Sequence, residues 1–439
     1  LFLSSLFNST SRNSNRFNST IATQRNMSGP FTSTLAATIG IVFVSVLLPV
    51  AEAGHGVEFT VMYPESNLAP GSQLYLRGSP PLSWDVPQAL SQFAPDTWVA
   101  AIDVTDSLLN ASNPVWDVDV KVMVNNDTWQ VGNNNRVHVT LADDLLQVKL
   151  CPYFLPTSTS AQHTMSQIFS PQLNNSRDVW IYVPAAMVEN TACSQATVLI
   201  MHDGQNLAPL WGVPGHLDTA IAAGTIGPVF VIGPYNTPDR IAEYTYSVDP
   251  TYGGGKGNLY LDFLQGTLMP AVVAAYPTLA LVVDNPSKVG IVGSSLGGLI
   301  SCYAAVTRPK SYHLAGCMSS SFWWNSADFA STIVPQIIPY NVQFQKYYMD
   351  SGGSGDCDDD RPFTSQVASL MVRSDFTLGY NLYWYLERAG HHNEYWWSRR
   401  FPVLLSYLLG RDALLNDDPG PLPPTMKRPV SQPTSRKNL

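Results

Sequence analysis

The pentapeptide at residues 293–297, Gly-Ser-Ser-Leu-Gly, has the residue types and spacing of a nucleophile elbow, the G-x-S-x-G turn that raises a serine above a sheet. An apolar run precedes it at residues 289–292, and an apolar segment rich in small residues follows at 298–305. A strand, a sharp turn and a helix are what the elbow requires, because only small neighbours leave room for the strained backbone of the serine. We therefore predict that Ser295 is a catalytic nucleophile.

A serine hydroxyl is a weak nucleophile near neutral pH, so it needs a histidine base and an acid that fixes the tautomer of the imidazole. His391 and His392 follow the last expected strand, at the start of the last expected helix. A loop rich in glycine and aspartate, residues 351–360, follows an earlier expected strand and supplies candidate acids. The chain order is thus serine, acid and histidine, as in an α/β-hydrolase.

The tetrahedral intermediate of such a reaction needs two backbone N–H donors for its oxyanion. We expect one from Leu296, directly after the nucleophile, and one from Gln205, where Gly204 lets the backbone turn its amide toward the site. His202 and Asp203 offer a second pair of catalytic residue types. We interpret them instead as residues that brace the loop, because they follow so closely after a strand.

Five motifs in a fixed order make the chain resemble an esterase family of α/β-hydrolases. That family contains enterobactin, feruloyl and acetyl-xylan esterases, S-formylglutathione hydrolase and the mycolyl transferases. The motifs lie at residues 202–206, 243–245, 293–298, 319–324 and 390–397. The resemblance covers about residues 177 to 410, and it implies a Ser-acid-His mechanism that needs no metal and no organic cofactor.

Carried over residue by residue, the resemblance matches Ser295 to the nucleophile and His392 to the base, through the pattern G-x-H-x-E-x-x-W. It favours Asp356 as the acid, and Asp350 and Asp358 remain alternatives. A tryptophan pair of the family, here Trp323 and Trp324, either lines the substrate pocket or packs in the core.

The pattern of strands and helices divides the chain into parts. Short alternating apolar segments separated by turn residues predict an all-β sandwich before residue 150. After residue 177, strand and helix patterns alternate, which predicts a mostly parallel sheet covered by helices on both faces. The expected parts are a leader with a signal peptide (1–53), the β-sandwich (54–150), a linker (151–176), the α/β-hydrolase domain (177–410) and a disordered proline-rich tail (411–439).

The order and spacing of aromatic residues in the expected sandwich resemble those of starch-binding modules, over about residues 57 to 140. The resemblance implies that Trp84 and Trp129 stack on sugar rings and that Lys121 and Asn135 bind hydroxyl groups. Gln130 stands where this family often has a glutamate. Glucan binding and a purely structural sandwich therefore both remain open.

The composition excludes some partners. The chain has 439 residues, of which 45% are hydrophobic and 13% are charged, and its formal net charge is −9. The apolar content suffices for buried cores, but this charge leaves no broad basic surface for nucleic acid.

Targeting signals favour export. Residues 35–50 are apolar and end on Ala-Glu-Ala, as in a signal peptide, so we expect a secreted protein without stable membrane insertion after cleavage. An uncleaved signal anchor is the alternative. Asn110, Asn126 and Asn174 begin N-glycosylation sequons, which agree with this route.

The five cysteines show no C-x-x-C pattern, so we expect no metal site. Cys151 and Cys193 are candidates for a disulfide. Cys302 is expected to be a small buried hydrophobic residue.

The sequence therefore predicts a secreted serine esterase that acts on a carbohydrate-linked or polysaccharide-associated ester. Two alternatives remain. One is a siderophore-type lactone esterase or an acyltransferase, and the other is a non-catalytic carbohydrate-binding protein with a relic hydrolase domain.

Overall fold

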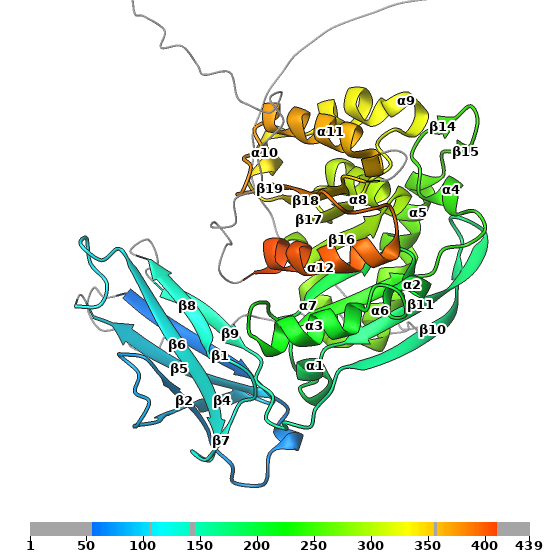
Figure 1. Cartoon of the computed structure of the whole chain (residues 1–439). Coiled ribbons are helices and arrows are strands. Elements are labelled where there is room, and N and C mark those ends of the chain that lie inside the picture. Colours follow the sequence, from blue (N-terminus) through cyan, green and yellow to red (C-terminus); the bar gives the residue numbers. More distant parts are fainter. Residues whose placement is uncertain (1–54, 106, 141–144, 355–357, 411–439) are drawn as a thin grey trace, which may run out of the picture. The chain divides into compact units, whose positions relative to one another are not determined.

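The computed structural model describes residues 55–105, 107–140, 145–354 and 358–410 (Figure 1). The expected signal peptide and the expected tail lie outside these residues. Within the described ranges, no helix is both long enough and apolar enough to cross a bilayer.

One eight-stranded sheet forms the base of the C-terminal part, with the strand order β10-β11-β13-β12-β16-β17-β18-β19. β10 and β11 pair antiparallel with each other, β11 pairs antiparallel with β13, and the six strands from β13 to β19 run parallel. The strands are β10 (Ala161–Ser170), β11 (Asn175–Val183), β12 (Thr197–Met201), β13 (Val229–Pro234), β16 (Val289–Ser294), β17 (Leu314–Met318), β18 (Lys346–Gly352) and β19 (Leu382–Glu387). The mostly parallel sheet predicted from the sequence is confirmed.

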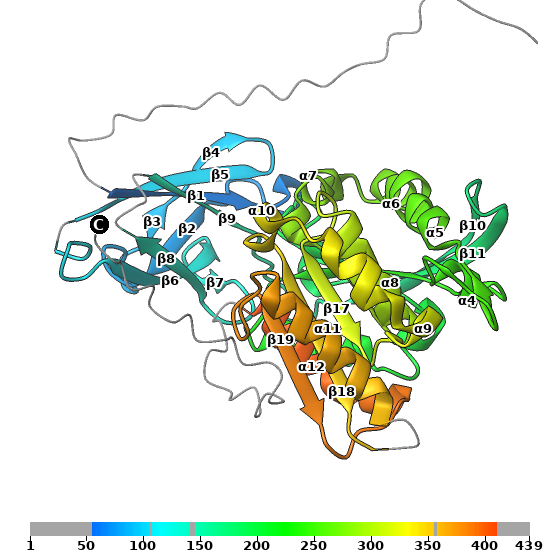
Figure 2. The same cartoon turned by 90° about the horizontal axis from the view of Figure 1, so that it is seen from above.

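Helices cover both faces of this sheet (Figure 2). Side chains of α8 and α11 join the core on one face, while side chains of α3 and α12 join the core on the other. The helices are α1 (Ala185–Glu189), α2 (Gly204–Leu207), α3 (Val213–Ala222), α4 (Arg240–Glu243), α5 (Gly257–Phe263), α6 (Met269–Ala275), α7 (Ala280–Val283), α8 (Leu296–Thr307), α9 (Trp324–Asp328), α10 (Pro339–Val342), α11 (Arg361–Arg373) and α12 (Glu394–Leu409). A π-helical turn, Leu264–Leu268, joins α5 to α6, and the 3₁₀ turn Asp358–Asp360 precedes α11.

The alternation of side chains along the central strands explains the two cores. Val198 and Ile200 of β12 pack on the face of α8, whereas Leu199 and Met201 pack on the face of α12. Both sets are apolar because each face of a parallel sheet is covered by helices.

The predicted linker, residues 151–176, is wrong in part. It contains the whole of β10, which pairs with β11 through backbone hydrogen bonds. β10 is an edge strand whose side chains are mostly exposed, so it lacks the apolar alternation by which a half-buried strand is recognised.

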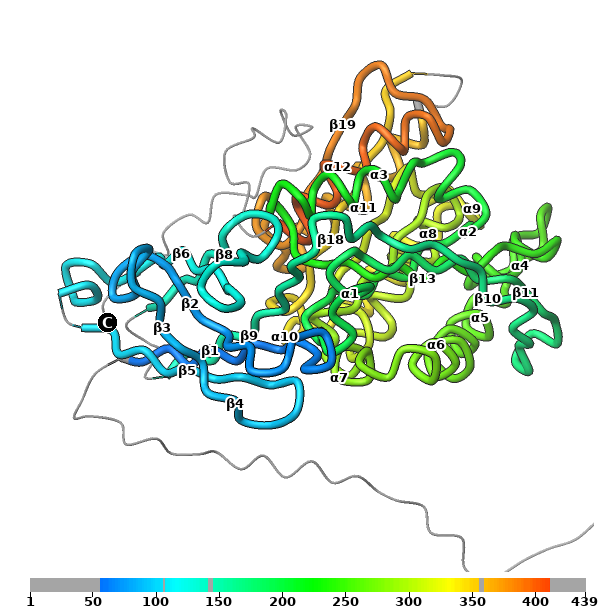
Figure 3. The backbone as a smooth tube through the Cα atoms, turned by 90° about the horizontal axis from the view of Figure 1, so that it is seen from below, coloured from blue at the N-terminus to red at the C-terminus, as the bar shows by residue number. Residues whose placement is uncertain are grey.

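Two sheets make up the N-terminal part (Figure 3). One has the order β4-β5-β1-β9, and the other has the order β3-β2-β6-β7 with β8 also paired to β6. The strands are β1 (His55–Met62), β2 (Leu74–Gly78), β3 (Gln88–Ala89), β4 (Ser91–Ala94), β5 (Thr97–Val104), β6 (Val115–Val124), β7 (Thr128–Trp129), β8 (Asn135–Thr140) and β9 (Leu145–Leu150). They enclose a hydrophobic core of their own. The likeness to starch-binding modules stays a prediction.

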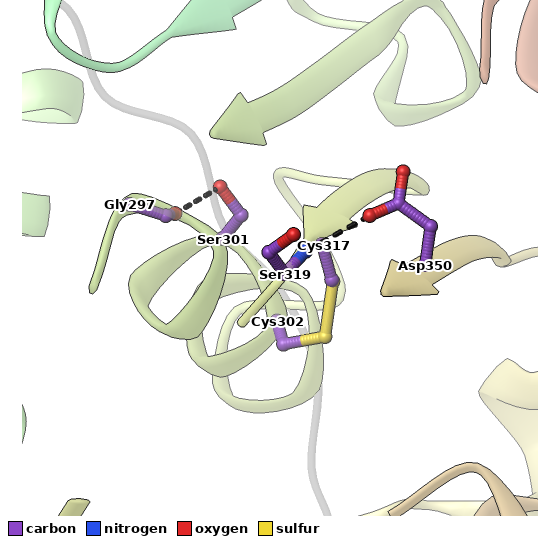
Figure 4. The surroundings of a disulfide bond; sticks show 6 residues. All are labelled: Gly297, Ser301, Cys302, Cys317, Ser319 and Asp350. Atoms are coloured by element: carbon purple, nitrogen blue, oxygen red, sulfur yellow. Dashed lines mark hydrogen bonds between the residues drawn. A yellow bond between two sulfur atoms is a disulfide. The ribbon is translucent and has the colours of Figure 1, made fainter. Parts of the chain in front are cut away.

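A disulfide joins Cys302 of α8 to Cys317 of β17, as Figure 4 shows. Cys302 is buried, as predicted, but the prediction did not include its disulfide. Because α8 packs against β17, the two Cα atoms lie 5.9 Å apart, although 15 positions separate them in the sequence. Among the cysteines that the structure describes, Cys151 and Cys193, the pair considered from the sequence, form no disulfide.

This disulfide should stabilise the C-terminal part. Replacing Cys302 and Cys317 with alanine should lower the free energy of unfolding by about 3 kcal/mol, the loop-closure value for a loop of this length. Urea unfolding of the wild type and the double variant measures the difference. A reducing agent should lower the stability of the wild type and leave that of the variant unchanged. Equal stability of the oxidised and reduced wild type would contradict the expectation.

Candidate active site

Ser295 stands alone at the turn between β16, which ends at Ser294, and α8, which begins at Leu296. Its backbone has φ 58° and ψ −125°, a conformation that costs about 1–3 kcal/mol in a residue other than glycine. The turn is tight, since a Cβ on Gly293 would lie 2.7 Å from the carbonyl carbon of Gly297. The structure thus has the strand, the strained serine and the helix in the predicted order.

The segment that follows β17 holds this turn. Ser295 donates its backbone N–H to the carbonyl oxygen of Met318 at 3.0 Å, and Ser321 donates its N–H to the carbonyl oxygen of Ser295 at 3.1 Å. The hydroxyl oxygens of Ser295 and Ser321 lie 3.3 Å apart. The nucleophile candidate is therefore fixed from one side and half-buried.

His392 and Asp359 form a close pair. Nδ1 of His392 lies 2.6 Å from Oδ1 of Asp359, and the histidine side chain is 31% exposed whereas the aspartate is fully buried. The other oxygen of Asp359 accepts hydrogen bonds from Ser319 Oγ at 2.6 Å, from the N–H of Gly352 and from Arg400 Nη2 at 3.3 Å. Burial alone would raise the pKa of Asp359, but these hydrogen bonds and the Arg400 charge hold it below the usual value.

The acid position differs from the sequence prediction. The carboxylate that contacts His392 is Asp359, and Asp356 lies outside the described residues. Asp350 binds Arg400 instead, with Oδ2 3.1 Å from Nε, and burial raises the pKa of Asp350 to about 6. Three successive aspartates at 358–360 look alike in sequence. Asp359 and Asp360 both have a left-handed backbone, with φ 50° and 57°, and only the folded structure shows that Asp359 is the one that reaches His392.

The segment after β17 connects the two halves of the site. Ser319 Oγ donates to Asp359, while Ser321 contacts Ser295. Trp397 donates its indole N–H to Ser319 Oγ at 2.9 Å and presents its ring edge-on to His392, with ring centroids 5.1 Å apart. Within the described residues Ser295 Oγ has no direct hydrogen bond to His392. Catalytic hydrogen bonds are commonly loose before substrate binds.

The two oxyanion candidates lie in the first turns of two helices, where backbone N–H groups have no partner inside the helix. Leu296 is the first residue of α8, and Gln205 is the second residue of α2. Glycine is required before Gln205, because a Cβ on Gly204 would lie 1.9 Å from the carbonyl oxygen of Gly233.

His202 and Asp203 brace the loop between β12 and α2. Asp203 accepts two hydrogen bonds from Arg240, at 2.7 and 2.8 Å, and a third from Asn236 at 2.6 Å. Nδ1 of His202 lies 3.0 Å from the hydroxyl of Tyr260, and burial lowers the pKa of His202 to about 3. A neutral, buried imidazole of this kind supports the loop.

His202 should make the fold sensitive to acid. The folded protein keeps its imidazole neutral, but the unfolded chain protonates it below about pH 6.5, so stability falls as the pH drops below that value. Between pH 7 and pH 5 the wild type should lose about 2 kcal/mol more unfolding free energy than His202→Phe does. Urea unfolding at both pH values tests this. Identical losses in the two proteins would contradict it.

The comparisons with known proteins agree with this geometry. A family model described as "Putative esterase" matches residues 170–408, just over half of the chain. The chain belongs to this esterase family. The match begins at the last residue of β10 and ends one residue before the end of α12, so it includes all of β11 and the helices α1 to α11.

Curated relatives of this chain match over shorter segments. The siderophore triacetylfusarinine C esterase of Aspergillus fumigatus is 36% identical over 74 residues, 17% of this chain and 24% of the relative. The iron(III) enterobactin esterase of Dickeya dadantii is 26% identical over 172 residues, 39% of this chain and 36% of the relative. The matched segments thus span between a quarter and about a third of these two relatives. A solved ferulic acid esterase has 15% identity and a TM-score of 0.47, covering 58% of this chain and 99% of its own.

Another of the five motifs has a structural role. Glu243 accepts a hydrogen bond from Arg177 Nη1 at 2.8 Å, and both side chains are buried. Asn175 donates to the same carboxylate at 2.7 Å. The motif at residues 243–245 therefore ties α4 to β11.

The N-terminal part of the chain brings two of the predicted sugar-binding residues together. Trp84 and Trp129 are 37% and 38% exposed, and their ring centroids lie 6.3 Å apart with 37° between the planes. Arg77 lies over the ring of Trp129, 5.6 Å from its centroid.

The two predicted polar partners, Lys121 and Asn135, differ in their surroundings. Lys121 lies on β6 opposite Arg77 of β2, and burial lowers the pKa of its ammonium group. Asn135 donates its amide to Val120 O at 3.3 Å and to Gln130 Oε1 at 3.1 Å, so its donors serve the fold.

Proposed function

We propose that this chain is a serine hydrolase that cleaves carboxylic esters through an acyl-enzyme. Ser295 Oγ attacks the ester carbonyl carbon while Nε2 of His392 takes the hydroxyl proton. The tetrahedral oxyanion accepts hydrogen bonds from the N–H groups of Leu296 and Gln205. His392 then gives its proton to the departing alcohol, and water activated by His392 releases the acid and regenerates Ser295.

One observation carries this proposal: the short segment after β17 contacts both Asp359, the partner of His392, through Ser319 and the strained Ser295 through Ser321. Asp359 accepts the Nδ1 proton and so leaves the Nε2 lone pair free to act as a base. Its lowered pKa keeps it anionic, which stabilises the imidazolium formed during attack.

We propose a siderophore-type ester as the substrate class. The support is that the names of both curated relatives described above refer to esterases of siderophores. A panel should contain a cyclic siderophore lactone with and without Fe(III), a hydroxycinnamoyl sugar ester, an acetylated xylo-oligosaccharide and p-nitrophenyl acetate, with Ser295→Ala as the blank. The siderophore lactone should give the highest kcat/KM. A higher value for either sugar ester would shift the proposal to a carbohydrate-linked substrate, and ester formation with an added sugar would indicate an acyltransferase.

A second candidate function, sugar binding by the N-terminal part, is favoured by the exposed pair Trp84 and Trp129. Two adjacent exposed rings offer stacking surfaces for a glucan chain. Calorimetry with a linear malto-oligosaccharide should show binding that Trp84→Ala with Trp129→Ala removes. Phe93→Ala, which alters an exposed ring on the other sheet, is the matched control. If the wild type does not bind the oligosaccharide, the sandwich has only a structural role.

We also propose that the protein is exported. The apolar run at residues 35–50 and the disulfide between Cys302 and Cys317 support this, because disulfides persist in oxidising compartments. N-terminal sequencing of protein recovered from culture medium tests it. Retention inside cells would contradict it.

A further inference from the structure

Asp360 stands where an aspartate normally caps a helix. It directly precedes α11, and an aspartate there commonly accepts a hydrogen bond from an N–H of the first turn. The side chain of Asp360 makes no such bond. Its Oδ2 instead accepts a hydrogen bond from the indole N–H of Trp323 at 3.1 Å.

The backbone favours this arrangement over the cap. Asp359 and Asp360 both have left-handed conformations, with φ 50° and 57°. The first carboxylate reaches His392, and the second reaches Trp323. Two strained residues and a missing cap each lower the local stability of the fold, and such costs are common at functional sites.

Trp323 lies two residues after Ser321, which contacts Ser295 through its N–H and its hydroxyl. The indole of Trp323 is only partly buried, whereas the neighbouring Trp324 is 1% exposed and belongs to the core. The ring of Tyr252 meets Trp323 edge-on, with centroids 5.9 Å apart, and Tyr252 is itself exposed. Trp323 therefore offers ring surface close to the nucleophile. The sequence alone could not show which of the two tryptophans does so.

We propose that Asp360 is a positioning residue that fixes the ring of Trp323 as a wall of the substrate site. The inference rests on the proposed ester hydrolysis. The carboxylate holds the indole N–H and so sets the orientation of the ring next to Ser295. Without this bond the ring can rotate, and the substrate loses a fixed apolar contact while the pair of His392 and Asp359 stays intact.

The charges around Asp360 make this contact depend on pH. The groups that face it are His392 from the loop before α12, Asp359 from its own turn and the indole of Trp323. Burial raises the pKa of Asp360 most strongly, His392 lowers it and Asp359 raises it, with the result at about 6. Above that pH the carboxylate makes a charge-assisted bond to the indole, and on acidification the bond weakens. Substrate affinity should therefore fall as the pH drops through 6.

Steady-state kinetics separate positioning from catalysis. Asp360→Ala and Trp323→Phe should each raise KM about tenfold, the value of one hydrogen bond to a charged group, and change kcat by less than about twofold. The double variant should be no worse than either single one, because both remove the same bond. Asp360→Asn keeps an acceptor oxygen, so it should recover most of the loss at pH 8 and lack the change in KM near pH 6. Asp284→Ala, at an exposed aspartate, is the control.

A second measurement does not depend on turnover. The indole N–H resonance of Trp323, assigned by its absence in Trp323→Phe, should shift with a midpoint near pH 6 in the wild type and not in Asp360→Asn. If the wild type cleaves no ester, the proposed function fails, yet this titration still tests the bond. A flat titration, an unchanged KM in Asp360→Ala, or a kcat reduced about as much as in Asp359→Asn would overturn the positioning role.

Discussion

Ser295→Ala is expected to abolish ester turnover, with kcat falling by about 10⁶-fold, as when the serine of a catalytic triad is removed. The acyl-enzyme cannot form on this residue without its hydroxyl. The fold should persist, because within the described part of the chain the lost hydroxyl makes one hydrogen bond, to Ser321 at 3.3 Å. Hydrolysis of p-nitrophenyl acetate measures the loss, and circular dichroism with thermal melting measures the fold.

Ser320→Ala is the matched control for this variant. Ser320 belongs to the same segment after β17, and its buried hydroxyl has no hydrogen-bond partner among the residues that the structure describes. Its removal should change kcat by less than about twofold. Undiminished turnover in Ser295→Ala, or an equal loss in Ser320→Ala, would contradict the assignment of the nucleophile.

Asp359→Asn should have the next largest effect, a fall in kcat of about 10⁴-fold, as for the corresponding change in a serine protease. An asparagine at this position no longer fixes the Nδ1 proton of His392, so the wrong tautomer faces Ser295. Because Asp359 also accepts hydrogen bonds from Ser319 and Arg400, unfolding must be measured in parallel. A variant that is folded and inactive gives the expected result.

Asp356→Asn and Asp358→Asn serve as controls that also test the acids considered from the sequence. Each should keep kcat within about twofold of the wild type. If Asp356→Asn lost activity and Asp359→Asn kept it, the acid would be Asp356 and the pair formed by His392 and Asp359 would have only a structural role.

The nucleophile and base candidates could be predicted because each lies in a short local pattern. Ser295 sits in a pentapeptide whose glycines determine the turn, and His392 sits in a motif at a helix start. Asp359 could not be predicted in this way. Its role depends on a left-handed backbone and on donors from Ser319 and Arg400, which are about 40 positions away in either direction.

The fold was predictable wherever burial leaves an apolar pattern. The central strands, such as β12 and β16, are buried on both faces and read as apolar runs. The edge strand β10 is held by backbone hydrogen bonds and has little apolar signal. The disulfide depends on the packing of α8 against β17, which spacing between cysteines does not reveal.

The most direct test of the catalytic assignment is labelling with a fluorophosphonate, followed by peptide mass spectrometry. The proposed mechanism predicts one label on the peptide that contains Ser295, and loss of labelling in His392→Ala. Absence of the label from the wild type, or a label on another residue, would contradict the assignment.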